Sequence, residues 1–410
     1  MAVTGITLLT AAGVRAAPGV LIKPLDAEFG WGPASISLAV AVSILAFGLG
    51  GPLGGGLVDR FGPRQVMLGG LLLIAAGLAP LLVMTQLWQL HLFWGLVAGL
   101  GTGAVGNVLG ATVAHRWFRA HRGIVIGVFA AASSAGQLIF LPSLMAFNLT
   151  WGWRSAIGLL LVATAVLLLP VALFMRDRPA SVGLRAFGDD ELVPATPAQR
   201  AEEARRTSLR DAVQTRDYWL LAGSFFICGY TSNGLIGTHL IPHAVEHGFT
   251  EVTAASAVAL MGTMNVVGTL ASGWLSDRFD NRKLLAGYYG FRALSLVALP
   301  LIIEIPQLFL FAIVYGLDWI ATVPPTANLT ANIYGRESLG TLYGWIFFSH
   351  MVGAAIAAYV GGFFREVLGD YHLVFISAAL LGFVAVSLSL GITPQRRPRP
   401  VPVAAPATPA

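Results

Sequence analysis

The chain repeats one pattern along most of its length: a long apolar run, followed by a short polar or glycine-rich segment. A helix of about 20 residues rises about 30 Å, which matches the hydrocarbon thickness of a bilayer. Each run of that length therefore predicts one membrane-spanning helix. Twelve such helices are predicted, over residues 3-22, 34-57, 65-85, 88-114, 122-147, 154-175, 218-241, 252-275, 284-303, 306-333, 340-363 and 371-392.

The apolar runs do not fit membrane strands. Segments such as LLVATAVLLLPVALFM are apolar on every face, whereas the strands of a transmembrane barrel alternate apolar and polar residues. The composition agrees, because 56% of the 410 residues are hydrophobic, only 11% are charged, and the mean hydropathy is +0.74. These values predict an all-α membrane protein. The single cysteine, Cys228, excludes an intramolecular disulfide.

Basic residues are segregated between alternate loops. Of the 25 Lys and Arg residues, 20 fall in the loops that follow even-numbered spans or in the tail. The opposite loops hold only Lys23, Arg154 and Arg365. The positive-inside rule therefore predicts that both termini are cytoplasmic, in a bacterial inner membrane. The net charge of +5 then reflects topology and not a nucleic-acid partner.

One long polar segment divides the spans six and six. Residues 176-217 include RDRPASVGLRAFGDDELVPATPAQRAEEARR and predict a cytoplasmic linker. The linker separates an N-terminal six-helix bundle, 1-175, from a C-terminal one, 218-393. The final segment, 394-410, is rich in Pro and Ala, which predicts a disordered cytoplasmic tail.

A ten-residue motif occurs once in each half. GGLVDRFGPR at 55-64 and GWLSDRFDNR at 273-282 share G-x-L-x-D-R-F-x-x-R, and each copy closes the second helix of its half. The motif resembles the loop signature of the major facilitator superfamily. The resemblance implies two six-helix bundles, a substrate site near the middle of the membrane between them, and a rocking motion that opens the site to either side.

The motif suggests a conformational latch. Its aspartates lie at cytoplasmic helix ends, where they can pair with arginines or accept bonds from the N-terminal N–H groups of a neighbouring helix. A solvated turn that only sets topology would fit a single copy equally well, but two copies in register favour the latch. The predicted latch residues are Asp59, Arg60, Arg64, Asp277, Arg278 and Arg282.

Finer resemblances point to carriers of carboxylates. RWFRAHRGIVIGV at 116-128, GWRSA at 152-156, RDRPASVGL at 176-184 and YGWIFFSH at 343-350 are similar to segments of the monocarboxylate porters and the bacterial oxalate/formate exchangers. The chain differs from those families at the basic residues that they are expected to use for binding the anion. Thr269 stands where the porters generally carry an arginine, and His350 stands where the exchangers use a lysine.

Candidate binding residues are polar groups inside apolar spans. A charge at bilayer depth costs about 2.5–3.5 kcal/mol, so it is usually retained for function. Arg15 lies near the middle of the first span, and with His350 it is predicted to bind substrate. Alternatively, Arg15 contacts a helix end and His350 is a neutral core histidine. Asn107, Asn233 and Tyr230 are predicted to complete the site.

Two further charges, Arg292 and Asp318, lie inside the ninth and tenth spans. Their depths agree approximately, so the leading interpretation is a structural ion pair that leaves neither charge alone in hydrocarbon. The alternative is that Asp318, the only carboxylate well inside a span, is the proton-coupling site. His350 is a second candidate for coupling, because its ordinary pKa lies near neutrality.

These observations predict a secondary active carrier of small organic anions, in which a monocarboxylate moves together with protons by alternating access. Electroneutral carboxylate exchange is the alternative within transport, and a non-transporting membrane sensor is the alternative outside it. The sequence contains no P-loop, no G-x-S-x-G elbow and no metal-ligand cluster, so no enzymatic activity, cofactor or metal is expected. The expected partners are the anion, protons and lipid, and the protein is expected to be a monomer.

Overall fold

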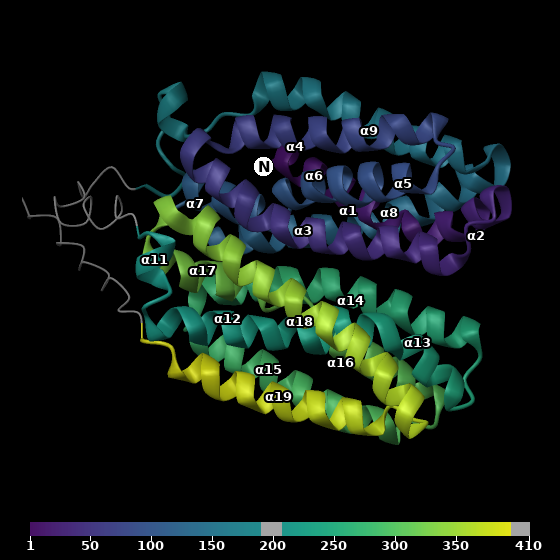
Figure 1. Cartoon of the computed structure of the whole chain (residues 1–410). Coiled ribbons are helices and arrows are strands. Elements are labelled where there is room, and N and C mark those ends of the chain that lie inside the picture. Colours follow the sequence, from purple (N-terminus) through teal and green to yellow (C-terminus); the bar gives the residue numbers. More distant parts are fainter. Residues whose placement is uncertain (190–206, 395–410) are drawn as a thin grey trace, which may run out of the picture.

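The computed structural model describes residues 1–189 and 207–394. Within these residues the regular structure is helical, apart from one isolated bridge between Phe118 and Phe187. Figure 1 shows two bundles side by side, one from the purple and blue first half and one from the green and yellow second half. The predicted all-α fold of two six-helix bundles is confirmed. Much of the predicted linker and nearly all of the predicted tail lie outside the described residues.

The N-terminal half begins with a bent pair of helices and ends before the linker. α1 and α2 meet at a bend of 43°, and together they are long and apolar enough to count as one candidate span. The elements of this half are α1 (Ala2–Ala16), α2 (Pro18–Phe29), α3 (Pro33–Phe61), α4 (Pro63–Leu78), η1 (Ala79–Val83), α5 (Leu87–Gln89), η2 (Leu90–Ala98), α6 (Gly99–Ala104), α7 (Asn107–Trp117), α8 (Arg122–Trp151) and α9 (Trp153–Phe174).

The second half follows two short linker helices, η3 (Pro179–Val182) and α11 (Leu209–Ala212). With the bent pair counted once, the described residues hold twelve candidate spans. The elements of the second half are α12 (Arg216–Gly229), η4 (Tyr230–Ile236), α13 (Gly237–Glu246), α14 (Glu251–Arg278), α15 (Asn281–Ala298), η5 (Leu299–Leu301), α16 (Ile305–Asp318), α17 (Val323–Tyr334), η6 (Arg336–Ser338), α18 (Leu339–Leu368) and α19 (His372–Gly391).

Several spans are longer than predicted. The predicted span 340-363, for example, lies within a continuous helical stretch from Arg336 to Leu368. Hydropathy detects the part of a helix that lies in hydrocarbon, whereas the helix itself continues through polar turns at either end. The number of spans could therefore be predicted more accurately than their ends.

Two crossings of long helices join the halves. α3 packs on α18, and α8 packs on α14. Glycines occupy the closest points: a Cβ on Gly55 would collide with the carbonyl of Gly340, and a Cβ on Gly123 would collide with the carbonyl of Gly273. The two halves therefore meet backbone to backbone, as small residues allow in membrane helices.

The motif aspartates cross this interface symmetrically. Asp59, near the end of α3, accepts hydrogen bonds from the N–H groups of Gly340 at 3.1 Å and Thr341 at 2.7 Å, at the start of α18. Asp277, near the end of α14, accepts from Gly123 at 2.7 Å and Ile124 at 3.0 Å, at the start of α8. Each half thus caps a helix N-terminus of the other half with a carboxylate.

The motif arginines act differently from the predicted latch. Arg64 donates to the Ala172 carbonyl at 2.7 Å, and Arg282 donates to the Ile392 carbonyl at 2.8 Å. These bonds join the second loop of each half to the end of the sixth span of the same half. They cannot form a latch between the halves, because both partners move together. Arg282 also pairs with Asp280 at 2.7 Å, and its hydrogen bonds hold the pKa of that carboxyl below its usual value.

Arg60 and Arg278 lie over aromatic rings of their own helical ends. The guanidinium carbon of Arg60 is 5.0 Å from the centre of the Phe61 ring, and that of Arg278 is 4.0 Å from the Trp274 ring. Such contacts hold each arginine against an aromatic ring of its own half. The described contacts therefore assign the capping role to Asp59 and Asp277.

Neutralising the capping carboxylates should loosen this end of the molecule. Asp59→Asn and Asp277→Asn each weaken charge-assisted bonds that contribute about 1.5–3 kcal/mol apiece. We expect the double variant to increase the population that is open on the linker side at least tenfold. Distances between spin labels on the two halves, measured by pulsed electron resonance in detergent, report that population.

Asp280→Asn is the matched control, since Asp280 bonds within its own half. It should leave the distance distribution unchanged. A double variant with the distribution of the unmodified protein would contradict the capping role.

Candidate functional site

A cavity of about 580 Å³, counted with the space at its mouth, lies between the two halves. Its N-terminal wall is largely polar, and its C-terminal wall mixes polar and aromatic side chains. The polar side chains of the first wall are Arg15, Asn107, Ser133, Ser134 and Gln137. Those of the second are Cys228, Ser232, Asn233, Trp319, Thr322 and His350. Four of the five predicted substrate residues therefore share one cavity.

Four spans are interrupted where they reach this cavity. The first bends between α1 and α2, the fourth is broken between α6 and α7, the seventh contains the π-helical segment η4, and the tenth is broken between α16 and α17. Arg15, Asn107, Asn233 and Trp319 lie at or beside these interruptions and line the cavity. Non-helical backbone is tolerated at membrane depth where it lines such a space.

The sequence explains the interruptions locally, although the predicted spans treated each one as continuous. The fourth span passes through GLGTGAVG, and repeated glycine weakens a helix. The tenth contains adjacent prolines, Pro324 and Pro325, which lack the N–H needed to continue a helix. Pro18 begins α2 directly after the first bend.

Arg15 is the permanent cation of the cavity. It lies in the last turn of α1, and its guanidinium carbon is 4.4 Å from the centre of the Phe47 ring of α3. Among the described residues, no carboxylate lies within ion-pair distance of Arg15. A cation held in a membrane protein without a counter-ion is costly, so this wall favours an anion.

Asn107 marks a helix N-terminus at the same wall. It is the first residue of α7, and Gly106 before it provides no side-chain cap. The first N–H groups of a helix have no intrahelical acceptor and carry partial positive charge. The Asn107 side-chain oxygen accepts a bond of 3.3 Å from the Ser133 hydroxyl, which leaves its amide N–H groups without a described partner.

His350 lies opposite, on α18. Its Nε2 is 3.3 Å from the amide nitrogen of Asn233, whose oxygen accepts from Trp319 Nε1 at 3.2 Å. The ring packs 4.7 Å from the Phe225 ring, centre to centre. Its Nδ1 is buried without a hydrogen-bond partner in the described chain, although the Cys228 thiol lies nearby. The Asn233 amide thus orients Nε2, and Nδ1 remains available to form a hydrogen bond with a ligand.

Arg292 and Asp318 form a buried ion pair behind the C-terminal wall. Arg292 Nε is 2.7 Å from Asp318 Oδ2, and the side chains are 0% and 3% exposed. Arg292 also donates to the main-chain carbonyls of Asp318 at 2.8 Å and Trp319 at 3.1 Å. These carbonyls lie where α16 ends, so the arginine caps a broken helix. Neither charged residue lines the cavity.

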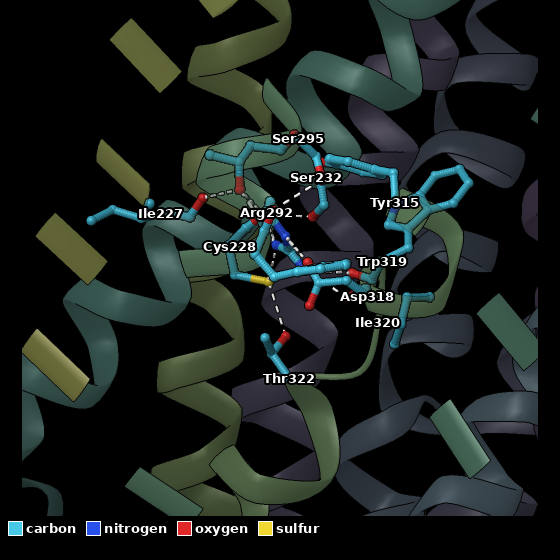
Figure 2. Close-up of polar contacts among 12 residues, drawn as sticks. Ile227, Cys228, Ser232, Arg292, Ser295, Tyr315, Asp318, Trp319, Ile320 and Thr322 are labelled. Atoms are coloured by element: carbon cyan, nitrogen blue, oxygen red, sulfur yellow. Dashed lines mark hydrogen bonds and ion pairs between the residues drawn. The ribbon is translucent and has the colours of Figure 1, made fainter. Parts of the chain in front are cut away.

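Cys228 connects this pair to the cavity, a role that the sequence analysis did not predict. Arg292 Nη1 lies 3.1 Å from Cys228 Sγ, which is also 3.1 Å from Thr322 Oγ1. Figure 2 shows the thiol between Arg292 and Thr322. Arg292 therefore joins the seventh span to the tenth just behind the cavity wall. Its hydrogen bonds depend on the tertiary fold and leave no pattern in the sequence.

Tyr230 is a correction to the predicted site. It is 7% exposed and lies in the core of the C-terminal half, with its hydroxyl close to Ser377 of α19. The π-helical segment that starts at Tyr230 directs Ser232 and Asn233 to the cavity instead. His239 of α13, in the same span, lies with its Nε2 2.9 Å from the Ala358 carbonyl.

The α8 wall was missed by the sequence analysis. Ser133, Ser134 and Gln137 lie on one face of α8, within an otherwise apolar stretch from 123 to 142, at the three- and four-residue spacing of helical neighbours. This stripe of polar residues is the sequence pattern from which the α8 wall could have been predicted. Asn265 of α14 donates to Ser134 at 2.8 Å and accepts from the Ile320 N–H at 3.1 Å. It lies one helical turn before Thr269, the position at which the sequence differs from the monocarboxylate porters.

The sequence profile described as Major Facilitator Superfamily matches residues 4–348. The chain belongs to the major facilitator superfamily. Within the superfamily it is 28% identical over 370 residues to the uncharacterized MFS-type transporter YcxA of Bacillus subtilis, which covers 88% of this chain and 85% of that protein. It is 26% identical over 374 residues to monocarboxylate transporter 12-B of Danio rerio, covering 86% and 76% of the two chains.

Solved structures of the superfamily share the fold at low identity. The proton:xylose symporter XylE aligns with a TM-score of 0.73 at 16% identity, covering 96% of this chain and 95% of its own. The human organic anion transporter MFSD10 aligns with a TM-score of 0.69 at 16% identity, covering 95% and 98%. This superfamily member is therefore an integral membrane protein with the transporter fold.

The ion pair can be separated from the transport machinery by a double-mutant cycle. Arg292→Gln or Asp318→Asn alone leaves one buried charge unpaired, which typically costs about 3–5 kcal/mol. We expect each single variant to lose more thermal stability in detergent than the double variant. The solvent-exposed pair Glu246 and Arg365, 2.6 Å apart, is the matched control, and removing it should change thermal stability little, because water screens the attraction.

A different result would change the role of Asp318. If Asp318→Asn folds normally, binds substrate and loses only proton-driven accumulation, the structural interpretation fails. Asp318 would then be the coupling residue, a role for which its second oxygen, without a partner in the described chain, is free.

Proposed function

We propose that this protein carries small organic anions across the bacterial inner membrane by alternating access, coupled to protons, with both termini in the cytoplasm. The observation that carries the proposal is Arg15, a cation in the cavity with no counter-ion among the described residues. The nearby N-terminus of α7 adds positive potential at the same wall. Similarity to monocarboxylate transporters supports an anionic substrate.

The second charge of the site is conditional. His350 faces Arg15 from the other half of the cavity and becomes cationic only when it binds a proton. A bound carboxylate favours that proton, and a protonated His350 favours the carboxylate, so occupancy by the two ligands is linked. This linkage is what a proton-coupled carrier of anions requires.

The interface between the halves supports alternating access. Asp59 and Asp277 each accept hydrogen bonds from backbone N–H groups of the opposite half. These bonds lie at the end of the molecule that carries the linker. The bond between Asn265 and Ser134 lies at the cavity itself. The described conformation is thus closed on the linker side. Rocking about the glycine crossings would break the two carboxylate caps and open the cavity to that side.

The fixed charge gives the first test of this function. Arg15→Gln should abolish saturable binding of anions, lowering affinity at least a hundredfold, while the protein remains monodisperse. Binding of labelled lactate and oxalate to purified protein, and their counterflow in proteoliposomes, measures the effect. Lys23→Gln is the matched control, since Lys23 is exposed beyond the bend in the same span. Unchanged affinity in Arg15→Gln would reject the assignment.

The conditional charge gives the second test. Lysine stays charged across the accessible pH range, so His350→Lys should retain anion exchange and lose most of its response to an inward proton gradient. Uptake into proteoliposomes with the internal pH fixed and the external pH varied from 5 to 8 measures this. His372→Lys, at an exposed histidine outside the cavity, should keep the ordinary profile.

An unmodified pH profile in His350→Lys would move the proton to Asp318 or to the substrate. Exchange that is independent of the proton gradient in the unmodified protein would favour electroneutral exchange instead. Saturable binding without counterflow of any acid would favour a sensor.

A further inference from the structure

The cavity gathers polar groups that have no partner within the described chain. Gln137 forms no described side-chain hydrogen bond, and the amide N–H groups of Asn107 and the Nδ1 of His350 are also without acceptor or donor. Arg15 contacts only the Phe47 ring among the described interactions. These groups come from three spans of one half and one span of the other, and all of them line the same space.

The neighbouring polar groups, by contrast, are satisfied. Ser134 donates to the Ala130 carbonyl and accepts from Asn265, and Ser232 donates to the Cys228 carbonyl. The unsatisfied groups are therefore a distinct set.

Gln137 is exposed, Arg15 and Asn107 are half-buried, and Nδ1 of His350 is buried without a partner in the described chain. A ligand that displaces water from these groups must replace the lost hydrogen bonds, because a polar group left unpaired on binding costs about 1–3 kcal/mol.

A short aliphatic acid cannot supply them. Its carboxylate would engage Arg15 and the α7 N-terminus, but its apolar body would leave the amides of Gln137 and Asn107 unpaired. Sites built to hydrogen-bond a substrate hydroxyl discriminate strongly against analogues that lack it.

We propose that the substrate is a polyhydroxylated monocarboxylate, an acid of the sugar-acid type whose carboxylate binds Arg15 and whose hydroxyl groups bind Gln137, Asn107 and Nδ1 of His350. This inference rests on the proposed anion-carrier function and names the chemical class of its substrate. Amides donate and accept, and the neutral imidazole, whose Nε2 accepts from the Asn233 amide, donates from Nδ1, so the set matches hydroxyl groups, which also do both. The aromatic side chains Phe225 and Phe347 pack against the carbon-bound faces of such a chain.

Three six-carbon probes separate charge from hydroxyl recognition. D-Gluconate carries both features, hexanoate carries only the carboxylate, and D-glucitol carries only the hydroxyl groups. Isothermal calorimetry on purified protein at pH 6 should show that gluconate binds at least tenfold more tightly than hexanoate, and that glucitol shows no saturable binding. Hexanoate binding as tightly as gluconate would overturn the proposal.

A matched pair of variants assigns the effect to the cavity. Gln137→Leu keeps the size of the side chain and removes its hydrogen bonds, so gluconate affinity should fall about tenfold while hexanoate affinity stays within twofold. Gln214→Leu, at an exposed position in the loop before α12, should change neither. Equal losses for both acids in Gln137→Leu would show a structural effect and would count against the proposal.

The probes also distinguish this inference from the function on which it rests. If hexanoate binds, depends on Arg15 and matches gluconate, the anion carrier stands and the hydroxyl class is rejected. If neither acid binds while glucitol does, the anion-carrier function itself fails. If neither acid nor glucitol binds, both proposals fail for ligands of this size.

Discussion

Arg292 donates hydrogen bonds to backbone carbonyls behind the cavity, at the break that follows α16. In hydrocarbon there is no water to bond freed carbonyl groups, so a helix can break only where the protein supplies donors. The break after α16 frees the carbonyls of Asp318 and Trp319, and Arg292 donates to both. The Asp318 carboxylate balances the charge of the arginine, and the same guanidinium reaches Cys228 beside η4. Arg292 thus bonds both to the backbone at Trp319 and to Cys228 of the seventh span, and both residues line the C-terminal wall.

The two halves therefore use their permanent cations in opposite ways. In the C-terminal half, Arg292 is neutralised by Asp318 and serves the scaffold. In the N-terminal half, Arg15 has no described counter-ion and faces the cavity. His350 lines the C-terminal wall and can take up a proton without breaking the Arg292–Asp318 pair. Under the proposed function, this division lets a proton enter and leave the site while the ion pair behind it keeps the broken spans in place.

The sequence predicted the fold well because hydropathy and repeated motifs report global constraints. Twelve apolar runs and two copies of the D-R-F motif were sufficient for the bundles. Arg15, His350, Asn107 and Asn233 were also found, since polar groups inside apolar spans are few. The predicted roles remain predictions, but the placement of these residues around one cavity follows from the structure.

What the sequence could not predict depends on local backbone geometry and on tertiary contacts. A π-helical turn contains an extra residue, and each residue rotates the following side chains by about 100°. The η4 segment therefore turns the side chains that follow Tyr230, and Asn233 lines the cavity while Tyr230 lies in the core. Cys228 gains its position from Arg292 and Thr322, which lie far away in the chain. Neither effect leaves a periodic signal.

The division of contacts also indicates which parts of the molecule move as units. Arg64 and Arg282 tie the second loop of each half to the sixth span of the same half, so they stiffen the bundles. Asp59 and Asp277 bond instead to backbone N–H groups of the opposite half, and water can replace these bonds when the interface opens. The Arg292–Asp318 pair lies wholly within one bundle and would persist through such a motion. A rocking transition can therefore exchange the carboxylate caps for water while the cavity walls keep their shape, provided that the glycine crossings act as the pivot.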